Sequence, residues 1–166
     1  MAVVALVFVD AGQAPLGRGS AAPDFELRVL GTAEGTAEAR LALDDLRGRV
    51  VLVNFWKTTC KPCEQEMPAM ERLYRILPRD QFELVAVASD PQESLVQAFQ
   101  DEYQLSFPIV LDPGEAVTQR YETMGVPETW LIDRDGRLVE RYIGPREWDE
   151  AEHVDRLRAL IREGGA

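Results

Sequence analysis

The stretch that decides the fold is Val50-Val51-Leu52-Val53-Asn54-Phe55-Trp56, which is followed after three residues by Cys60-Lys61-Pro62-Cys63. The first segment is aliphatic or aromatic except for one amide, which predicts a buried strand. Residues Glu64 to Leu77 predict a helix. The two cysteines therefore stand where a strand turns into a helix. The first cysteine meets the positive end of that helix, which favours a thiolate over a thiol.

Cys60 and Cys63 are the two cysteines of the chain. At this spacing they can close on each other, so the pair can carry two electrons. A static disulfide across two intervening residues would restrain the unfolded chain little. A zinc site needs four ligands, and the single histidine, His153, stands far from the pair in the sequence. The pair therefore predicts redox activity that needs neither a metal nor another cofactor.

Length and charge limit the classes of partner. The chain has 166 residues, 46% of them hydrophobic, which is enough for one globular domain with its own core. Its formal net charge of -11 would repel phosphate backbones and anionic lipid. We therefore expect no nucleic acid partner.

The N-terminus gives the one indication of location. Ala2 to Val9 is an apolar octet, and small residues follow it. The octet is too short to span a bilayer, and no Lys or Arg precedes it, so it is not a complete signal peptide. We expect residues 1–22 to be an apolar segment and linker, the remnant of an export or anchor segment and a possible membrane tether, ahead of a domain over 23–166. A short strand is the alternative for the octet.

Apolar runs and helix-start signals alternate along the rest of the chain. The doubled Gly-Thr-Ala-Glu unit over Gly31–Glu38 predicts a solvated loop, and Asp133–Gly136 predicts a hairpin turn. We expect an α/β fold, with a central mixed sheet and helices on both faces. The expected strands are 25–30, 41–43, 50–56, 82–88, 107–111, 129–132 and 138–143, and the expected helices are 64–77, 94–103, 115–121 and 148–162.

Two separated motifs carry a family resemblance: Asn54-Phe55-Trp56 with Cys60-Lys61-Pro62-Cys63, and Gly125-Val126-Pro127-Glu128-Thr129-Trp130-Leu131-Ile132-Asp133. Together with Glu66 and Pro68, they resemble the thioredoxin superfamily. They look most like its TlpA-like, cytochrome c maturation type of thiol-disulfide oxidoreductase, among the AhpC/TSA-like redoxins. The resemblance runs from about Pro23 to the C-terminal helix. It implies a thioredoxin-like fold with an N-terminal strand extension and a central αβ insertion.

The resemblance also implies roles for individual residues. Cys60 would be the nucleophile and Cys63 the resolving thiol, in a cycle that passes through a mixed disulfide with a protein substrate. A cis bond before Pro127 would place the backbone of Val126 beside the cysteines, as an edge for an extended substrate. We expect Val126, Pro127 and Trp56 to bind the substrate.

Three residues are expected to tune the thiols. The cation of Lys61 would stabilise the neighbouring thiolate, and Pro62 would stiffen the first helical turn. Asn54 stands where cytosolic thioredoxins carry a buried carboxylate, so another group must take the proton of the resolving thiol. Glu66 is our candidate, because its (i, i+3) spacing places it on the same helix face as that thiol. The alternative is that Glu66 is a solvated helix glutamate.

The leading hypothesis is an enzyme that exchanges disulfides with protein cysteines. It would act as a reductant in an extracytoplasmic compartment, periplasmic or membrane-tethered, for example during cytochrome c or metal-site assembly. Its partners would be protein thiols or disulfides and an upstream dithiol electron donor, and it would act as a monomer.

Two other functions are weighed against this hypothesis. A peroxidase of the peroxiredoxin type, with antioxidant activity, requires a proline and a threonine where this chain has Val53 and Lys57. The second alternative is a thioredoxin-like binding or chaperone module in which the thiols are incidental.

Overall fold

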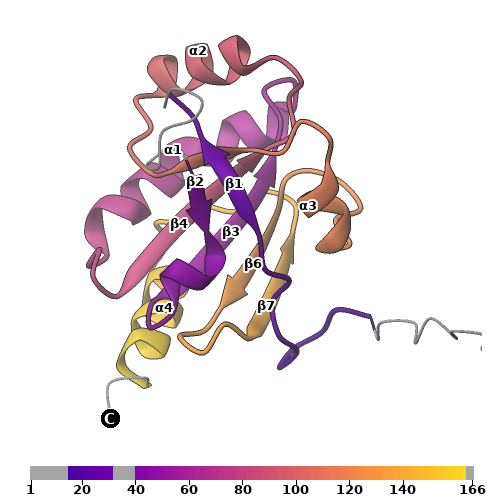
Figure 1. Ribbon diagram of the computed structural model, residues 1–166. Helices are drawn as coiled ribbons and strands as arrows, with labels where there is room; N and C mark the ends of the chain where they lie inside the picture. Colours follow the sequence, from indigo (N-terminus) through magenta and orange to yellow (C-terminus); the bar gives the residue numbers. More distant parts are fainter. Residues whose placement is uncertain (1–14, 32–39, 164–166) are drawn as a thin grey trace, which may run out of the picture.

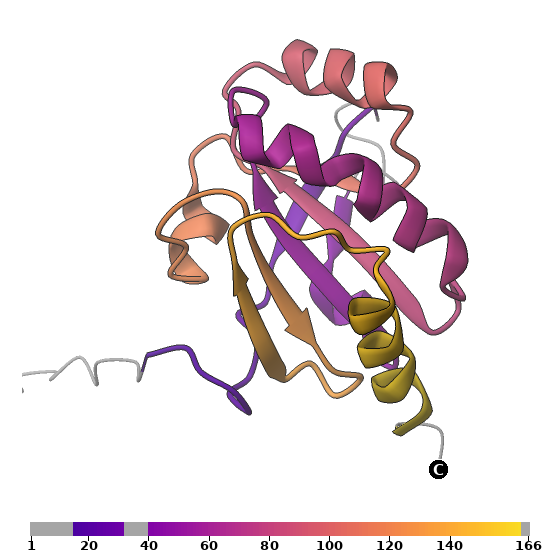
Figure 2. The same cartoon turned by 180° about the vertical axis from the view of Figure 1, so that it is seen from behind.

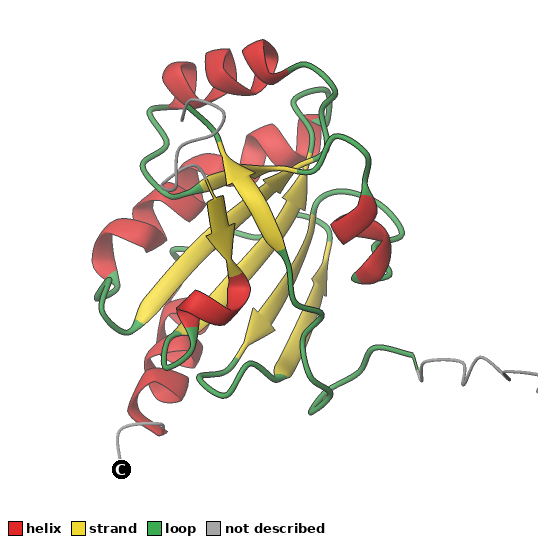
Figure 3. Cartoon of the chain, viewed as in Figure 1, coloured by secondary structure: helices red, strands yellow, loops and turns green. Residues whose placement is uncertain are grey.

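The computed structural model describes residues 15–31 and 40–163. The octet Ala2–Val9, and the doubled Gly-Thr-Ala-Glu unit after Gly31, lie outside the described residues. Within these limits the chain forms a mixed sheet with helices on both faces (Figure 1, Figure 3). The α/β class expected from the sequence is therefore confirmed.

The sheet has seven strands within the described residues, in the order β2-β1-β5-β4-β3-β6-β7. β3 pairs in parallel with β4, and β4 pairs in parallel with β5, while the other neighbours are antiparallel. The strands are β1 (Glu26–Val29), β2 (Arg40–Ala42), β3 (Val50–Trp56), β4 (Phe82–Ala88), β5 (Ile109–Leu111), β6 (Glu128–Ile132) and β7 (Leu138–Ile143).

The helices form a layer on each side of the sheet. α1 (Lys61–Ile76) and α4 (Ala151–Glu163) cover one face, and they stand in front of the strands in Figure 2. α3 (Ala116–Arg120) and a 3-10 helix (Leu43–Leu46) lie on the other face (Figure 1). α2 (Glu93–Tyr103) packs into the same core as α1.

β3 lies at the centre of this arrangement and is buried along its whole length. Leu52 and Trp56 belong to the core beneath α1 and α4, whereas Val53 and Phe55 belong to the core on the α3 side. A strand covered on both faces needs apolar residues at successive positions, because neighbouring side chains point to opposite faces. This requirement explains the unbroken apolar run in the sequence.

The start of α1 differs from the expected helix start at Glu64. The helix begins at Lys61, and Cys60 is its N-cap residue. The first turn of a helix has no use for the N–H that Pro62 lacks, so proline is tolerated there. The cysteine pair is therefore part of the helix start rather than a loop before it.

The chain enters the domain earlier than expected. Residues 19–22, assigned to the linker by the sequence pattern, pair with the start of β7. The N–H of Gly19 donates to the carbonyl of Leu138 at 2.7 Å, and the N–H of Ala22 donates to the carbonyl of Gly136 at 2.9 Å. Ala22 is buried in the core. No helix within 15–31 or 40–163 is both long and apolar enough to cross a membrane.

Candidate active site

The cysteine pair is closed into a disulfide at the N-terminus of α1. Cys63 is fully buried, while Cys60 remains partly exposed. The Sγ atom of Cys60 accepts a hydrogen bond from the backbone N–H of Cys63 at 3.2 Å. The same N–H and the helix dipole would stabilise a thiolate at Cys60 once the disulfide is reduced. The arrangement gives one accessible sulfur and one protected sulfur.

The loop before β6 faces the accessible sulfur. The peptide bond between Val126 and Pro127 is cis. The carbonyl oxygen of Val126 lies 3.6 Å from Sγ of Cys60. No residue in the described part of the chain accepts a hydrogen bond from the N–H of Val126. A backbone edge that can pair with a second chain therefore lies beside the reactive atom.

Glu66 is buried, so it is not a solvated helix residue. Its carboxylate accepts three hydrogen bonds, one from β3 and two from the segment before α4. Nδ2 of Asn54 in β3 donates to Oε1 at 2.8 Å. Oε2 accepts from the indole Nε1 of Trp148 at 3.1 Å and from the backbone N–H of Arg146 at 3.2 Å. The side chain is thus fixed one helical turn after Cys63.

Burial raises the pKa of the Glu66 carboxyl to about 7. The hydrogen bonds from Trp148, Asn54 and Arg146 act in the opposite direction, because each stabilises the ionised form. A carboxyl with this pKa exchanges protons in the neutral range, which is what a proton acceptor for a thiol requires. This pKa is compatible with the role expected for Glu66.

The structure places Lys61 in a different setting from the one expected. Its side chain is mostly exposed, and its Nζ lies 2.8 Å from each carboxylate oxygen of Glu64. Hydrogen bonds from Lys61 and then Tyr103 hold the pKa of the Glu64 carboxyl below its usual range. The positive charge next to Cys60 is therefore offset by a negative charge one turn along the helix.

The expectation that Trp56 contacts the substrate is wrong. Its side chain is fully buried. Its ring packs on Phe99 with a centroid distance of 4.8 Å, and Phe99 packs on Tyr103 at 4.5 Å. The row of three rings ties the end of β3 to α2. Trp56 supports the cysteine loop from inside the core.

Thr58 and Asp90 form an anchor that sequence reasoning missed. The carboxylate of Asp90 accepts hydrogen bonds from the Thr58 backbone N–H at 3.0 Å and from its hydroxyl at 2.5 Å. This contact fixes the loop before Cys60. Trp56 pairs with Ala88 at the carboxyl ends of two parallel neighbours, so the second residue after each strand lies in the same region. The contact between Thr58 and Asp90 could have been predicted from this strand register.

Three residues around Glu66 were also missed as site residues: Thr129, Arg146 and Trp148. Arg146 and Trp148 lie 80 and 82 residues from Glu66 in sequence. No local pattern marks them. Thr129 lies two residues after Pro127 and pairs with Asn54 in the sheet. Its position beside Asn54 could therefore be predicted once β3 and β6 were known to be neighbours.

The positions that a peroxide site would need are occupied differently. Val53 is buried inside β3. Lys57 forms an ion pair with Glu115 at the amino end of α3. A peroxide is activated by a threonine hydroxyl, and an ammonium group held by a carboxylate is no substitute for it. The local geometry therefore favours disulfide exchange over peroxide reduction.

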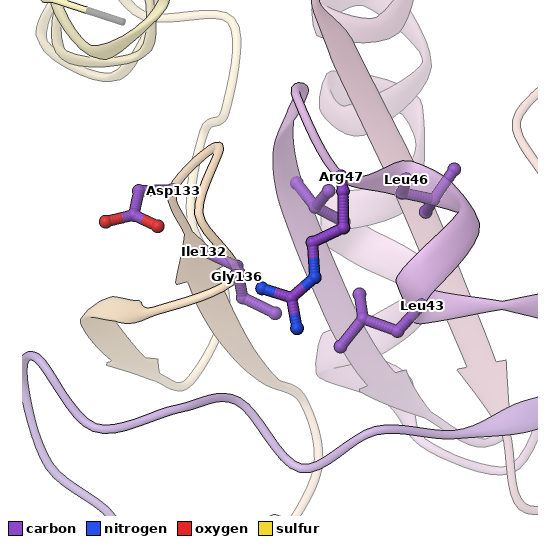
Figure 4. A pocket seen from close by; sticks show the side chains of 7 residues that line it. Leu43, Leu46, Arg47, Ile132, Asp133 and Gly136 are labelled. Carbon is purple, nitrogen blue, oxygen red and sulfur yellow. The ribbon is translucent and has the colours of Figure 1, made fainter.

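A small pocket occurs at the other end of the sheet, near the start of β3 (Figure 4). Arg47 reaches across from the end of the 3-10 helix, and Leu43, Leu46 and Ile132 provide an apolar lining. The pocket is remote from the cysteines. Within the described ranges, no three side chains of His, Cys, Asp or Glu gather as a metal site would require.

A disulfide between a partly exposed and a buried cysteine at a helix start, beside a free backbone edge of this sheet, meets the requirements of a thioredoxin-like thiol-disulfide oxidoreductase, and the protein is of that class. The family model described as the AhpC/TSA family matches residues 18–141, and the chain belongs to this family.

Curated relatives agree with this assignment. The thiol-disulfide oxidoreductase ResA of Bacillus cereus is 38% identical over 134 residues, which cover 81% of this chain and 74% of the relative. The thioredoxin-like protein YneN of Bacillus subtilis is 38% identical over 137 residues, covering 81% and 76%.

Solved structures agree as well. A crystal structure described as a thiol:disulfide interchange protein DsbE from Chlorobium tepidum has a TM-score of 0.74 at 27% identity, covering 91% of this chain and 99% of that one. The solution structure of a thiol:disulfide interchange protein from Bacteroides sp. has a TM-score of 0.73 at 25% identity, covering 89% and 91%. The thioredoxin-like fold is therefore confirmed.

Proposed function

We propose that this enzyme reduces disulfides in proteins, with Cys60 as the nucleophile and Cys63 as the resolving thiol. The observation that carries the proposal is the asymmetry of the pair: Cys60 is partly exposed beside the carbonyl of Val126, and Cys63 is fully buried. A bulky protein disulfide can reach the first sulfur and not the second.

The cycle starts from the reduced pair. The Cys60 thiolate attacks one sulfur of the substrate disulfide, that bond breaks, and the departing substrate thiolate takes up a proton. The Cys63 thiolate then attacks the sulfur of Cys60 in the mixed disulfide. The second substrate thiol leaves, and the bond between Cys60 and Cys63 closes. The substrate gains two electrons and the enzyme loses two.

The substrate chain would be held in an extended conformation along Val126 and Pro127. The N–H of Val126 offers a donor, and its carbonyl offers an acceptor close to the reacting sulfur. Main-chain pairing of this kind gives affinity without demanding a particular side chain. Such a site suits several client proteins that present a cysteine in an extended segment.

Glu66 would accept the proton of Cys63 as that thiol becomes a nucleophile. The two residues lie one turn apart on α1, and the carboxyl pKa of about 7 lies close to neutral pH. Cys63 is buried away from water, so an internal base is the direct route for its proton.

The setting of the reaction is also part of the proposal. The apolar octet Ala2–Val9 and the resemblance to the TlpA-like, cytochrome c maturation type of reductase support a tethered protein that works outside the cytoplasm, in cytochrome c or metal-site assembly. An upstream dithiol donor must restore the reduced pair after each cycle, because one turnover leaves the disulfide closed.

The proposal is tested with insulin reduction by dithiothreitol and by trapping of intermediates. Cys60→Ser should abolish the catalysed reduction. Cys63→Ser should accumulate a mixed disulfide with a cystine-containing peptide, detected by intact-protein mass spectrometry. If Cys60→Ser instead fully replaces the wild-type protein in cells, a binding or chaperone module is supported. Rapid peroxide consumption by Cys63→Ser would support a peroxidase.

A further inference from the structure

The side-chain amide of Asn54 is satisfied on one side only. Its Nδ2 donates to Oε1 of Glu66 at 2.8 Å and also lies 3.0 Å from the hydroxyl of Thr129. Its Oδ1 is buried and accepts no hydrogen bond from any residue that the structure describes. An unpartnered buried carbonyl is costly, so an amide in this position calls for an explanation.

The partners of Glu66 differ in what they can do when the carboxyl gains a proton. The indole of Trp148 and the backbone N–H of Arg146 both point at Oε2, and neither can accept a hydrogen bond. Oε1 has Asn54 as its partner, and an amide carries a donor and an acceptor at nearly equivalent positions. A protonated Glu66 therefore finds an acceptor only at Asn54 among these three.

We propose that Asn54 is a positioning residue that follows the protonation state of Glu66 by rotating its amide through half a turn. With the carboxylate, Nδ2 donates to Glu66 and Thr129, as in the structure. When Oε1 takes up a proton, Oδ1 turns to face Glu66 and accepts that proton's hydrogen bond. The hydroxyl of Thr129 reverses as well, because a hydroxyl can donate or accept.

The groups around Glu66 allow the Asn54 amide to rotate without placing another charged group against the carboxyl. The charged group that acts on Glu66 is the guanidinium of Arg146, in the segment before α4. The groups that face it from β3 and β6, Asn54 and Thr129, are neutral. On α1, Cys63 lies one turn earlier and is closed in the disulfide. A carboxylate at position 54 would instead repel an ionised Glu66 and couple the two titrations.

The inference rests on the proposed role of Glu66 as a proton acceptor, yet its test needs no client and no turnover. Nuclear magnetic resonance of the oxidised full chain follows Glu66 through its side-chain carboxyl carbon, while the thiols stay locked. Nuclear Overhauser contacts from the Asn54 Nδ2 protons to the Thr129 side chain should be present about 1.5 pH units above the midpoint and lost about 1.5 units below it. Contacts that persist on both sides would overturn the inference.

Two variants give an independent reading. Trp148→Phe removes a partner that only donates, so the Glu66 midpoint should rise by about one pH unit. Asn54→Leu removes a partner that serves both protonation states, so the midpoint should move by less than about half a unit. A rise in Asn54→Leu as large as that in Trp148→Phe would show that Asn54 serves the carboxylate alone and would overturn the inference. If the wild-type enzyme does not catalyse insulin reduction while the resonance measurements come out as expected, the proposed function is refuted and the inference about Asn54 stands.

Discussion

The indole Nε1 of Trp148 donates to Oε2 of Glu66 at 3.1 Å and so joins the segment before α4 to the active-site helix. Trp148 is fully buried and also packs on Tyr142 and His153. The C-terminal part of the fold therefore closes over the carboxyl that the reaction needs. This contact makes the ionisation of Glu66 a property of the whole fold rather than of α1, and it has consequences for stability.

The stability of the protein should fall as pH rises through the range where Glu66 titrates. In the unfolded chain this carboxyl loses its proton near 4.5, whereas the folded protein keeps the proton to about pH 7. Between these values the folded state binds more protons, so the free energy of unfolding decreases, by about 3 kcal/mol at most. Glu66→Gln removes that decrease. Urea unfolding should find the variant close to wild type at about pH 4.5 and more stable above pH 7.

Glu71→Gln is the matched control on the same helix. Burial alone would raise the pKa of Glu71, but hydrogen bonds from Ser106 and Arg75 hold it below its usual range. This carboxylate stabilises the fold above the unfolded pKa, and its contribution is lost as pH falls. Glu71→Gln should therefore destabilise the protein at neutral pH. Equal effects of the two substitutions would contradict the opposite pKa shifts.

Glu64→Gln should make the Cys60 thiol more acidic. The change removes a negative charge one turn from the sulfur and releases Lys61 from its ion pair. Exposed charges are screened, so we expect a decrease of a few tenths of a pKa unit. The measurement is the pH dependence of iodoacetamide alkylation of the reduced protein. Glu152→Gln makes the same charge change at an exposed position of α4 and should leave the profile unchanged. A shift of the same size in Glu152→Gln would mean that net charge, and not the position of Glu64, controls the thiol.

Asp90→Ala should destabilise the protein by about 1–3 kcal/mol, because the partly buried N–H and hydroxyl of Thr58 lose a charged acceptor. Thr58→Val keeps the backbone hydrogen bond and removes only the hydroxyl, so its effect should be smaller. Both values come from urea unfolding of the oxidised protein. The anchoring role of Asp90 would be refuted by an effect of Thr58→Val equal to or larger than that of Asp90→Ala.

Met124→Ser should slow the reduction of protein disulfides without changing the reaction with small ones. Met124 is 83% exposed and stands two residues before Val126, whose carbonyl lies near Cys60. Loss of about 1–2 kcal/mol of apolar contact with a client corresponds to a roughly 5- to 30-fold lower rate. Insulin and a small aromatic disulfide are the two substrates.

Ile76→Ser is the control for that experiment. Ile76 is 50% exposed and ends α1, at the opposite end of the helix from Cys60. It should leave both rates unchanged. If Ile76→Ser slows insulin reduction as much as Met124→Ser does, the effect comes from general surface polarity and not from a client contact.

Local patterns were enough to predict most of the fold. The apolar runs at 50–56 and 82–88 match β3 and β4 at both ends, because a strand covered on both faces needs apolar residues at successive positions, and the segment at 138–143 matches β7. Boundaries moved where tertiary contacts decide them. β5 is shorter than the run at 107–111, and residues 19–22 join the sheet although they look like a linker.

By itself, the sequence determined the redox pair and its place at a helix start, because the order of a strand, two cysteines and a helix is encoded within about 30 consecutive residues. The surroundings of Glu66 were decided by tertiary structure alone. Asn54, Thr129 and Trp148 come from β3, β6 and the segment before α4, and packing of those elements brings them to one buried carboxyl. Burial depends on that packing, so the pKa of Glu66, and with it the proton chemistry of the site, exists only in the folded chain.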